Sequence, residues 1–153
     1  MILADANVLI YAFRADTPRH ALCRSWLERI IMSETRFGLS PLVLSTVARI
    51  TTNPRIFRHV SAFEEAFAYC DNLLSQPHCE IVQPGGRHWA IFRRLCVEMD
   101  IREPRVTDAW FAALAIEHGC IWITYDSDYR QFPGLDWALC AQGNARSSST
   151  GSG

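Results

Sequence analysis

The sequence predicts an α/β fold in which a central parallel β-sheet is covered by helices on both faces. Short apolar segments alternate along the chain with longer segments whose apolar residues recur at helical spacing. Such alternation favours parallel strands, because two parallel strands need a crossover between them and that crossover is usually a helix. With 153 residues, 49% of them hydrophobic, the chain suffices for one domain with its own core.

Local sequence signals place the elements in order from the N-terminus. Ser40-Pro41 is an N-cap followed by proline at the first helical position, Ser61 and Glu64 have the spacing of a capping box, and Gly119 ends a helix. Asn53-Pro54 breaks another helix. We expect strands at 2–4, 37–40, 79–82, 120–124 and 135–140, and helices at 7–14, 18–31, 41–51, 62–76, 87–99 and 106–119.

Composition limits the classes of function. All 15 basic residues are arginine, so a general-base lysine, a Schiff-base lysine and a phosphate-binding lysine are excluded. The six cysteines form no C-x-x-C pair, which favours reduced core cysteines over a zinc site. No apolar run is long enough to span a membrane and the N-terminus does not resemble a signal peptide, so we expect a cytoplasmic protein. Residues 1–141 form the expected domain, and 142–153 read as a flexible Gly/Ser-rich tail.

Four aspartates stand where a parallel sheet would bring them together. Asp5 ends the first strand, Asp126 and Asp128 follow the strand 120–124, and Asp108 lies in the first turn of the helix before that strand. Each has a structural interpretation when taken alone, as a helix cap, a first-turn acid or a turn residue. Together, at the carboxyl ends of strands, they indicate an oxygen-ligand site for Mg²⁺ or Mn²⁺.

Five segments of the chain, in order, resemble the PIN-domain ribonucleases of the VapC toxin type. They are ILADANVLIYA, RITTNPRIF, GGRHWAIFRRL, VTDAWFAALAIEHG and ITYDSDYRQFPGLDW, which span residues 1 to about 139. The resemblance implies a PIN-like three-layer α/β/α fold and a homodimer. It also implies Mg²⁺- or Mn²⁺-dependent cleavage of RNA and inhibition by a VapB-type antitoxin.

The resemblance assigns roles to individual positions. The catalytic acids would be Asp5, Asp108, Asp126 and Asp128, the first three of them metal ligands, with Asn7 and Thr124 holding the carboxylates. Thr46 stands where the family usually has Glu, and Pro104 where it often has Asn. Arg14 and Arg19 flank the opening after the first strand and are candidates for contacts with RNA phosphates.

Three functions remain open from the sequence. A toxin of this family would use activated water to cleave RNA and leave a 3′-hydroxyl and a 5′-phosphate. A PIN-like domain that binds RNA or a partner with weak or no nuclease activity is the alternative, because Thr46 removes a carboxylate. A haloacid-dehalogenase-like phosphatase is disfavoured, because that family needs a lysine and carries Asp-x-Asp on its first strand.

Overall fold

The computed structural model describes residues 1–140 and has the expected α/β architecture. Its strands are β1 (Ile2–Ala4), β2 (Phe37–Leu39), β3 (Cys79–Ile81), β4 (Ile121–Thr124) and β5 (Trp137–Leu139). Its helices are α1 (Ala6–Phe13), α2 (His20–Met32), α3 (Pro41–Thr51), α4 (Phe63–Leu74), α5 (His88–Glu98), α6 (Val106–His118) and the 3₁₀ helix η1 (Ser127–Gln131). The predicted tail, 142–153, lies outside the described residues.

All five strands are parallel, in the order β3-β2-β1-β4-β5. The chain first builds the sheet outward from β1 through β2 to β3, and then returns to the other side of β1 with β4 and β5. The direction therefore reverses between β1 and β4, where Leu3 pairs with Trp122 and Ala4 with Ile123. Ligands of open parallel sheets bind beyond the carboxyl ends of the strands at such a reversal.

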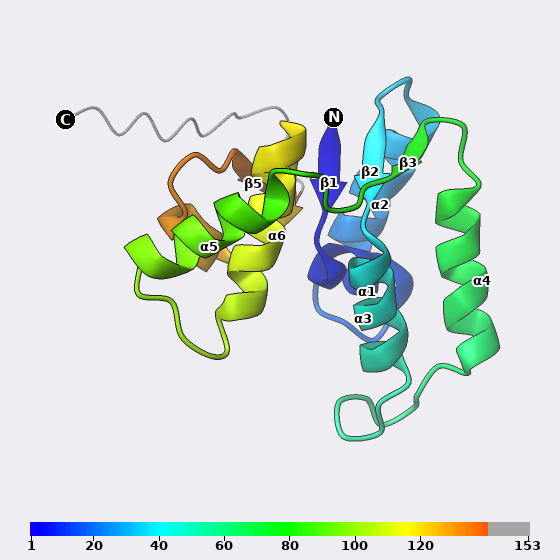
Figure 1. Cartoon of the computed structure of the whole chain (residues 1–153). Helices are drawn as coiled ribbons and strands as arrows, with labels where there is room; N and C mark the ends of the chain where they lie inside the picture. Colours follow the sequence, from blue (N-terminus) through cyan, green and yellow to red (C-terminus); the bar gives the residue numbers. More distant parts are fainter. Residues whose placement is uncertain (141–153) are drawn as a thin grey trace.

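Helices cover both faces of this sheet. Right-handed crossovers require α1 to α4, which connect β1, β2 and β3, to lie on one face, and α5 and α6, which follow β3, on the other. Figure 1 shows the α5–α6 pair set apart from α1 to α4, with β1 between the two groups. The predicted three-layer α/β/α fold is confirmed.

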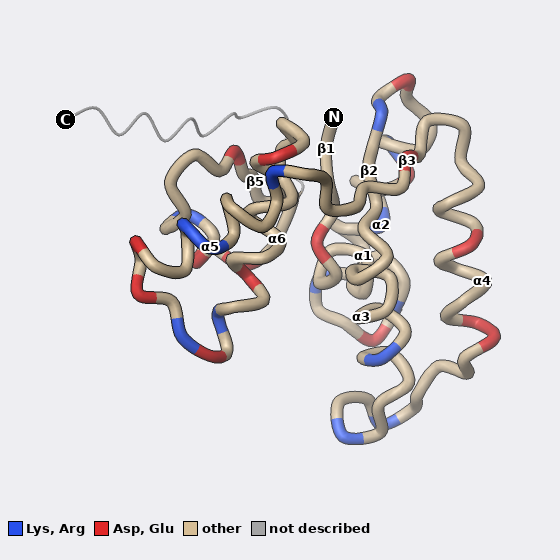
Figure 2. Tube along the Cα trace, viewed as in Figure 1, with Lys and Arg blue, Asp and Glu red and all other residues tan. Residues whose placement is uncertain are grey.

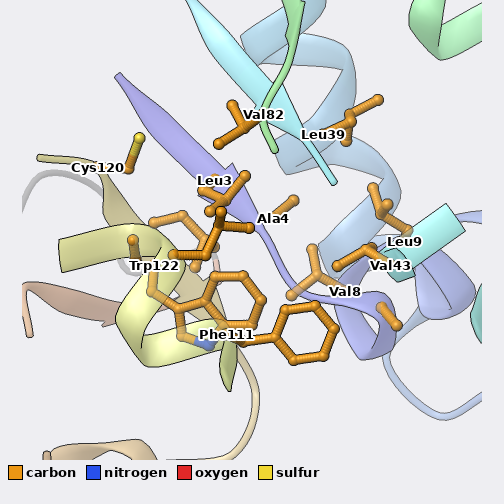
Figure 3. Packing of buried hydrophobic residues seen from close by; sticks show 14 of the residues in the cluster. Leu3, Ala4, Val8, Leu9, Leu39, Val43, Val82, Phe111, Cys120 and Trp122 are labelled. Carbon is orange, nitrogen blue, oxygen red and sulfur yellow. The ribbon is translucent and has the colours of Figure 1, made fainter. Parts of the chain in front are cut away.

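The core fills both spaces between the sheet and its helices. Leu3 and Trp122 on the central strands are fully buried, and the Trp122 ring stacks on Phe111 of α6 with centroids 5.3 Å apart. Figure 3 shows Val8 and Leu9 of α1 beside Val43 of α3. Apolar contacts thus fix α1 and α6 against β1 and β4, and the predicted acids lie in α6 or just after β1 and β4.

The helix signals of the sequence are confirmed at three ends and wrong at one. Ser40 accepts a hydrogen bond from the Leu42 amide at the start of α3, and Gly119 ends α6 with a left-handed φ of 62°. Helix α3 ends at Thr51, just before Asn53-Pro54. The capping box is wrong, because Ala62 is the N-cap of α4 and the Ser61 hydroxyl accepts instead from Arg14 Nη1 at 2.9 Å.

Within the described part of the chain, no helix combines the length and apolar character that crossing a membrane requires.

Candidate active site

Asp5 sits at the junction of β1 and α1 and is held on both of its oxygens. Oδ1 accepts from the Ala6 amide at 2.6 Å, which makes Asp5 the N-cap of α1, and Oδ2 accepts from the Thr124 hydroxyl at 2.7 Å. The Asp5 amide donates to the Ile123 carbonyl at 2.8 Å, within the β1–β4 ladder. The carboxylate is therefore fixed at the point where the strand order reverses.

The Thr124 hydroxyl connects β1, α1 and the segment after β4. It donates to Asp5, accepts from Asn7 Nδ2 at 3.3 Å and accepts from the Asp126 amide at 3.0 Å. Asn7 in turn accepts from the Tyr125 amide through Oδ1 at 3.2 Å. Thr124 thus binds the Asp5 carboxylate directly, and Asn7 connects Thr124 with the Tyr125 backbone beside Asp126.

Asp108 enters the site from the first turn of α6. Its Oδ1 accepts from the Tyr129 hydroxyl at 3.2 Å. Tyr129 itself is buried against Trp122 and Phe132, and burial first, then the nearby Asp5 and Asp108 carboxylates, raise the pKa of its phenol. Tyr129 therefore stays a neutral donor that positions Asp108.

Asp126 and Asp128 have different surroundings. Asp126 is the N-cap of η1, with Oδ1 accepting from the Asp128 amide at 2.9 Å. Asp128 Oδ2 pairs with Arg105 Nη2 at 2.8 Å, and both side chains are roughly half exposed. The negative charge of Asp128 is thus balanced by an arginine, whereas no ion pair of the described residues involves Asp5, Asp108 or Asp126.

Burial and neighbouring carboxylates disfavour the ionised forms of Asp5 and Asp108. Burial first, and then charge repulsion from Asp108 and Asp126, raise the pKa of Asp5 to about 6, against two hydrogen bonds that lower it. Burial also raises the pKa of Asp108, and Asp126 adds to that effect. A bound cation would relieve this repulsion.

The donor set fits a partly hydrated divalent cation. Among residues 1–140, no group of three or more His, Cys, Asp or Glu side chains is positioned to hold a metal ion. Mg²⁺ does not need such a cage, because it keeps several waters and is held by one or two carboxylates together with substrate phosphates. Asp5, Asp108 and Asp126 offer the hard oxygen donors that this mode requires.

The remaining predicted residues lie in three different settings. Thr46 is partly exposed on α3, and its hydroxyl donates to the Leu42 carbonyl one turn earlier, so the hydroxyl is used within the helix. Arg14 packs over Phe57 and binds Asp16, Ser61 and the His59 carbonyl, which makes it a structural anchor rather than an open phosphate contact.

Arg19 lies over the Tyr125 ring, 3.9 Å from its centroid. Both residues line a shallow groove of about 560 Å³ together with Ser127 and Leu139, next in sequence to the acidic segment. Arg19 therefore remains a candidate for an RNA contact.

Two residues of the site were missed from the sequence. Tyr129 carries a signal only in retrospect, since it follows the Asp-x-Asp segment by one residue and its partner Asp108 is far away in the chain. Arg105 lies one helical turn before Asp108, and this spacing indicates that the two residues share a face.

Comparison with known proteins assigns this geometry to a family. Residues 2–135 match the model of the PIN domain. The chain is 39% identical to ribonuclease VapC31 of Mycobacterium tuberculosis over 132 residues, which cover 86% of this chain and 93% of the relative. It is 36% identical to ribonuclease VapC43 of the same species over 137 residues, covering 90% and 93%.

Solved structures share the fold at low sequence identity. VapBC2 from Rickettsia felis, bound to a DNA fragment from its promoter, matches with a TM-score of 0.67 and 17% identity over 91% of this chain and 98% of that one. VapC20 of Mycobacterium tuberculosis, a sarcin–ricin loop cleaving toxin, matches with a TM-score of 0.65 and 17% identity over 88% and 98%. The family match, the two relatives and the shared fold together show that the chain belongs to the PIN-domain family, among its VapC-type ribonuclease toxins.

Proposed function

We propose that the chain is an endoribonuclease that requires Mg²⁺ or Mn²⁺ and cleaves RNA by attack of an activated water. The observation that carries the proposal is the gathering of carboxylates at the strand reversal, where burial first and then the charges of Asp108 and Asp126 raise the pKa of Asp5. A bound divalent cation would neutralise the scissile phosphate and lower the pKa of an attacking water. Asp5, Asp108 and Asp126 would hold it.

The protein contributes orientation and charge. Thr124 fixes the Asp5 carboxylate from one side while the start of α1 fixes it from the other, and the Tyr129 hydroxyl fixes Asp108. Asp128, already paired with Arg105, would orient a water rather than supply a fourth charge. Cleavage at such a site leaves a 3′-hydroxyl and a 5′-phosphate.

The partners follow from the same proposal. The substrate is RNA, and the groove lined by Arg19 and Tyr125 gives it a cation and an aromatic face next to the acids. A VapB-type antitoxin would neutralise the toxin by covering this edge, and the chain would act as a homodimer in the cytoplasm.

A cleavage assay with controlled metal tests the proposal. The purified chain, incubated with bulk RNA, should cleave with Mg²⁺ or Mn²⁺, stop with EDTA and recover when metal is restored. Asp5→Asn should abolish cleavage, whereas Asp16→Asn, an acid that pairs with Arg14 away from the site, should leave it intact. Cleavage that persists in EDTA, or in Asp5→Asn, would refute a metal-dependent site at these carboxylates.

A second function is favoured by one observation. The hydroxyl of Thr46 is occupied within α3, so this helix supplies no carboxylate at the position where the family usually has one. A site short of one charge would bind RNA or a partner without rapid cleavage. RNA binding without metal-dependent cleavage in the same assay would select this alternative.

A further inference from the structure

Two buried cysteines face each other between α2 and the end of β5. Cys140 Sγ donates a hydrogen bond to Cys23 Sγ across 3.5 Å, and the two residues are 2% and 0% exposed. A disulfide needs the sulfur atoms to approach to about 2.05 Å, a movement of roughly 1.5 Å from this contact. No other two cysteines of residues 1–140 are in hydrogen-bonding contact with each other.

We propose that Cys23 and Cys140 form a two-electron oxidation site, at which hydrogen peroxide or an organic peroxide closes a disulfide between α2 and β5. The Cys23 sulfur attacks one peroxide oxygen, the O–O bond breaks, and one water (or an alcohol) leaves with a sulfenic acid on Cys23. The Cys140 sulfur then attacks the Cys23 sulfur and releases the hydroxyl group as a second water. Both thiol protons leave in the products, and the two sulfur atoms together lose two electrons.

The direction of the hydrogen bond distinguishes the two thiols. Cys140 is the donor and Cys23 the acceptor, and this bond lowers the pKa of Cys23 while it raises that of Cys140. The thiolate is the form that attacks a peroxide. Cys23 therefore suits the attacking role and Cys140 the role of the thiol that closes the bond.

Oxidation of the pair would restrain the groove that Arg19 and Tyr125 line. Leu22 and Leu139, the neighbours of Cys23 and Cys140 in sequence, both line the groove that Arg19 and Tyr125 also line. A disulfide would therefore fix one wall of the groove to the other at its base. The Cys140 amide also donates to the Thr124 carbonyl at 3.3 Å, and the Thr124 hydroxyl donates to the Asp5 carboxylate.

The location also provides a route for the oxidant. Among the strands of residues 1–140, β5 is at the edge of the sheet and pairs with β4 alone, so its end can open without disrupting the rest of the ladder. A small peroxide needs only that local opening to reach the pair. Cellular thiols return the disulfide to the dithiol by exchange, which makes the modification reversible.

Thiol counting and peptide mapping on the wild-type chain test the inference without any RNA. After treatment with hydrogen peroxide, a maleimide under denaturing conditions should label four of the six cysteines, and the intact mass should fall by two hydrogens. Mapping should recover a peptide pair joined through Cys23 and Cys140. Tm should rise on the order of 10 °C and return on reduction, because the bond closes a long loop.

Matched serine variants separate this pair from oxidation in general. Cys23→Ser and Cys140→Ser should each abolish the intramolecular disulfide, whereas Cys120→Ser, which removes another buried thiol, should keep it. The wild-type mapping alone decides the matter if a serine variant fails to fold. Recovery of another pairing, of disulfides only between chains, or of a reduced Cys23–Cys140 pair beside oxidised Cys96 would overturn the proposal. Loss of nuclease activity is not part of the readout, so a failed function proposal leaves this test intact.

Discussion

Burial of the Asp5 carboxylate near two other aspartates lowers the stability of the folded chain and, for the same reason, favours cation binding at the site. Its partly buried position, with Asp108 and Asp126 nearby, raises its pKa to about 6, so at neutral pH the folded chain holds a charge that the unfolded chain holds more easily. A shift from 3.8 to about 6 corresponds to a penalty on the order of 2–3 kcal/mol. That penalty is the free energy that a cation can recover on binding.

The first prediction concerns the pH dependence of stability. Because the folded pKa of Asp5 is raised, the free energy of unfolding in EDTA should fall as pH rises from about 4 to about 6, and the full penalty should be present above pH 6. Asp5→Asn retains an N-cap and should be more stable than wild type at pH 7.5, by about 2 kcal/mol, but not at pH 4. Urea unfolding at both pH values measures the difference.

Divalent metal should make the wild type more stable than Asp5→Asn, the reverse of their order in EDTA. Millimolar Mg²⁺ or Mn²⁺ should raise the Tm of wild type and leave that of Asp5→Asn nearly unchanged, with Asp108→Asn also losing the gain. Equal wild-type melting curves with and without metal would contradict a metal site at these residues.

The second prediction concerns the missing charge at position 46. Hard cations depend on the number of charged oxygen ligands, and a Thr hydroxyl that already donates to Leu42 adds none. Thr46→Glu should tighten metal binding by on the order of tenfold, about 1.4 kcal/mol, and raise RNA cleavage at low metal. Titration calorimetry and the cleavage assay on both forms measure this. Unchanged affinity and rate would mean that the site is complete without a carboxylate there.

At the scale of elements, the sequence predicts what depends on short-range chemistry. Ser40-Pro41, Asn53-Pro54 and Gly119 act through their own backbone or the next turn, so their helix ends are where the sequence placed them. The capping box fails because Ser61 has a competitor far away in the chain. Arg14, 47 residues earlier, takes the hydroxyl that a local signal would assign to the helix.

The third prediction follows from this anchor. Arg14 ends α1 and binds the connection between α3 and α4 through Ser61 Oγ, the His59 carbonyl and the face of Phe57. Lysine offers neither a planar group nor several fixed donors. Arg14→Lys should therefore lower the free energy of unfolding by about 2 kcal/mol, measured by urea unfolding.

Arg19 provides the contrast for Arg14. Arg19→Ala should leave stability within about 0.5 kcal/mol of wild type and weaken RNA binding, because its guanidinium lies over Tyr125 at the groove. An Arg14 variant that loses RNA affinity while its stability is unchanged would contradict the assignment of Arg14 to structure.

At the scale of the whole molecule, the predicted acids gather because the topology brings the ends of distant strands to one edge. The sequence predicted Asp5, Asp108 and Asp126 from their places at strand and helix ends, and the family resemblance added Thr124. The strand order turns those places into neighbours. Tyr129 and Arg105 escaped prediction because their roles depend on side-chain reach between elements, not on position along one element.

The distribution of charge is also a property of the whole molecule. Figure 2 shows basic and acidic residues spread over many elements, including a basic stretch in the connection after α3. The chain has 15 arginines and 16 acids. Without the four aspartates of the site, 12 acids remain against those 15 arginines, so the acidic edge is a local feature of a molecule whose remainder is slightly positive.

The fourth prediction uses this acidic edge to detect the antitoxin. A VapB-type partner that places an arginine among Asp5, Asp108 and Asp126 would supply the missing positive charge and lower the pKa of Asp5 from about 6. Binding at pH 6 should then release up to roughly half a proton, because Asp5 is about half protonated in the free chain, and binding at pH 8 should release almost none. Titration calorimetry in two buffers of different ionisation enthalpy measures the release, with the product of the adjacent small gene as the partner. Asp5→Asn should bind without that release.

Two results would contradict this prediction. A tight complex that shows no proton release at pH 6 would mean that the partner covers the acidic edge without neutralising it. A toxic chain that the product of the adjacent gene does not bind would refute the antitoxin proposal itself.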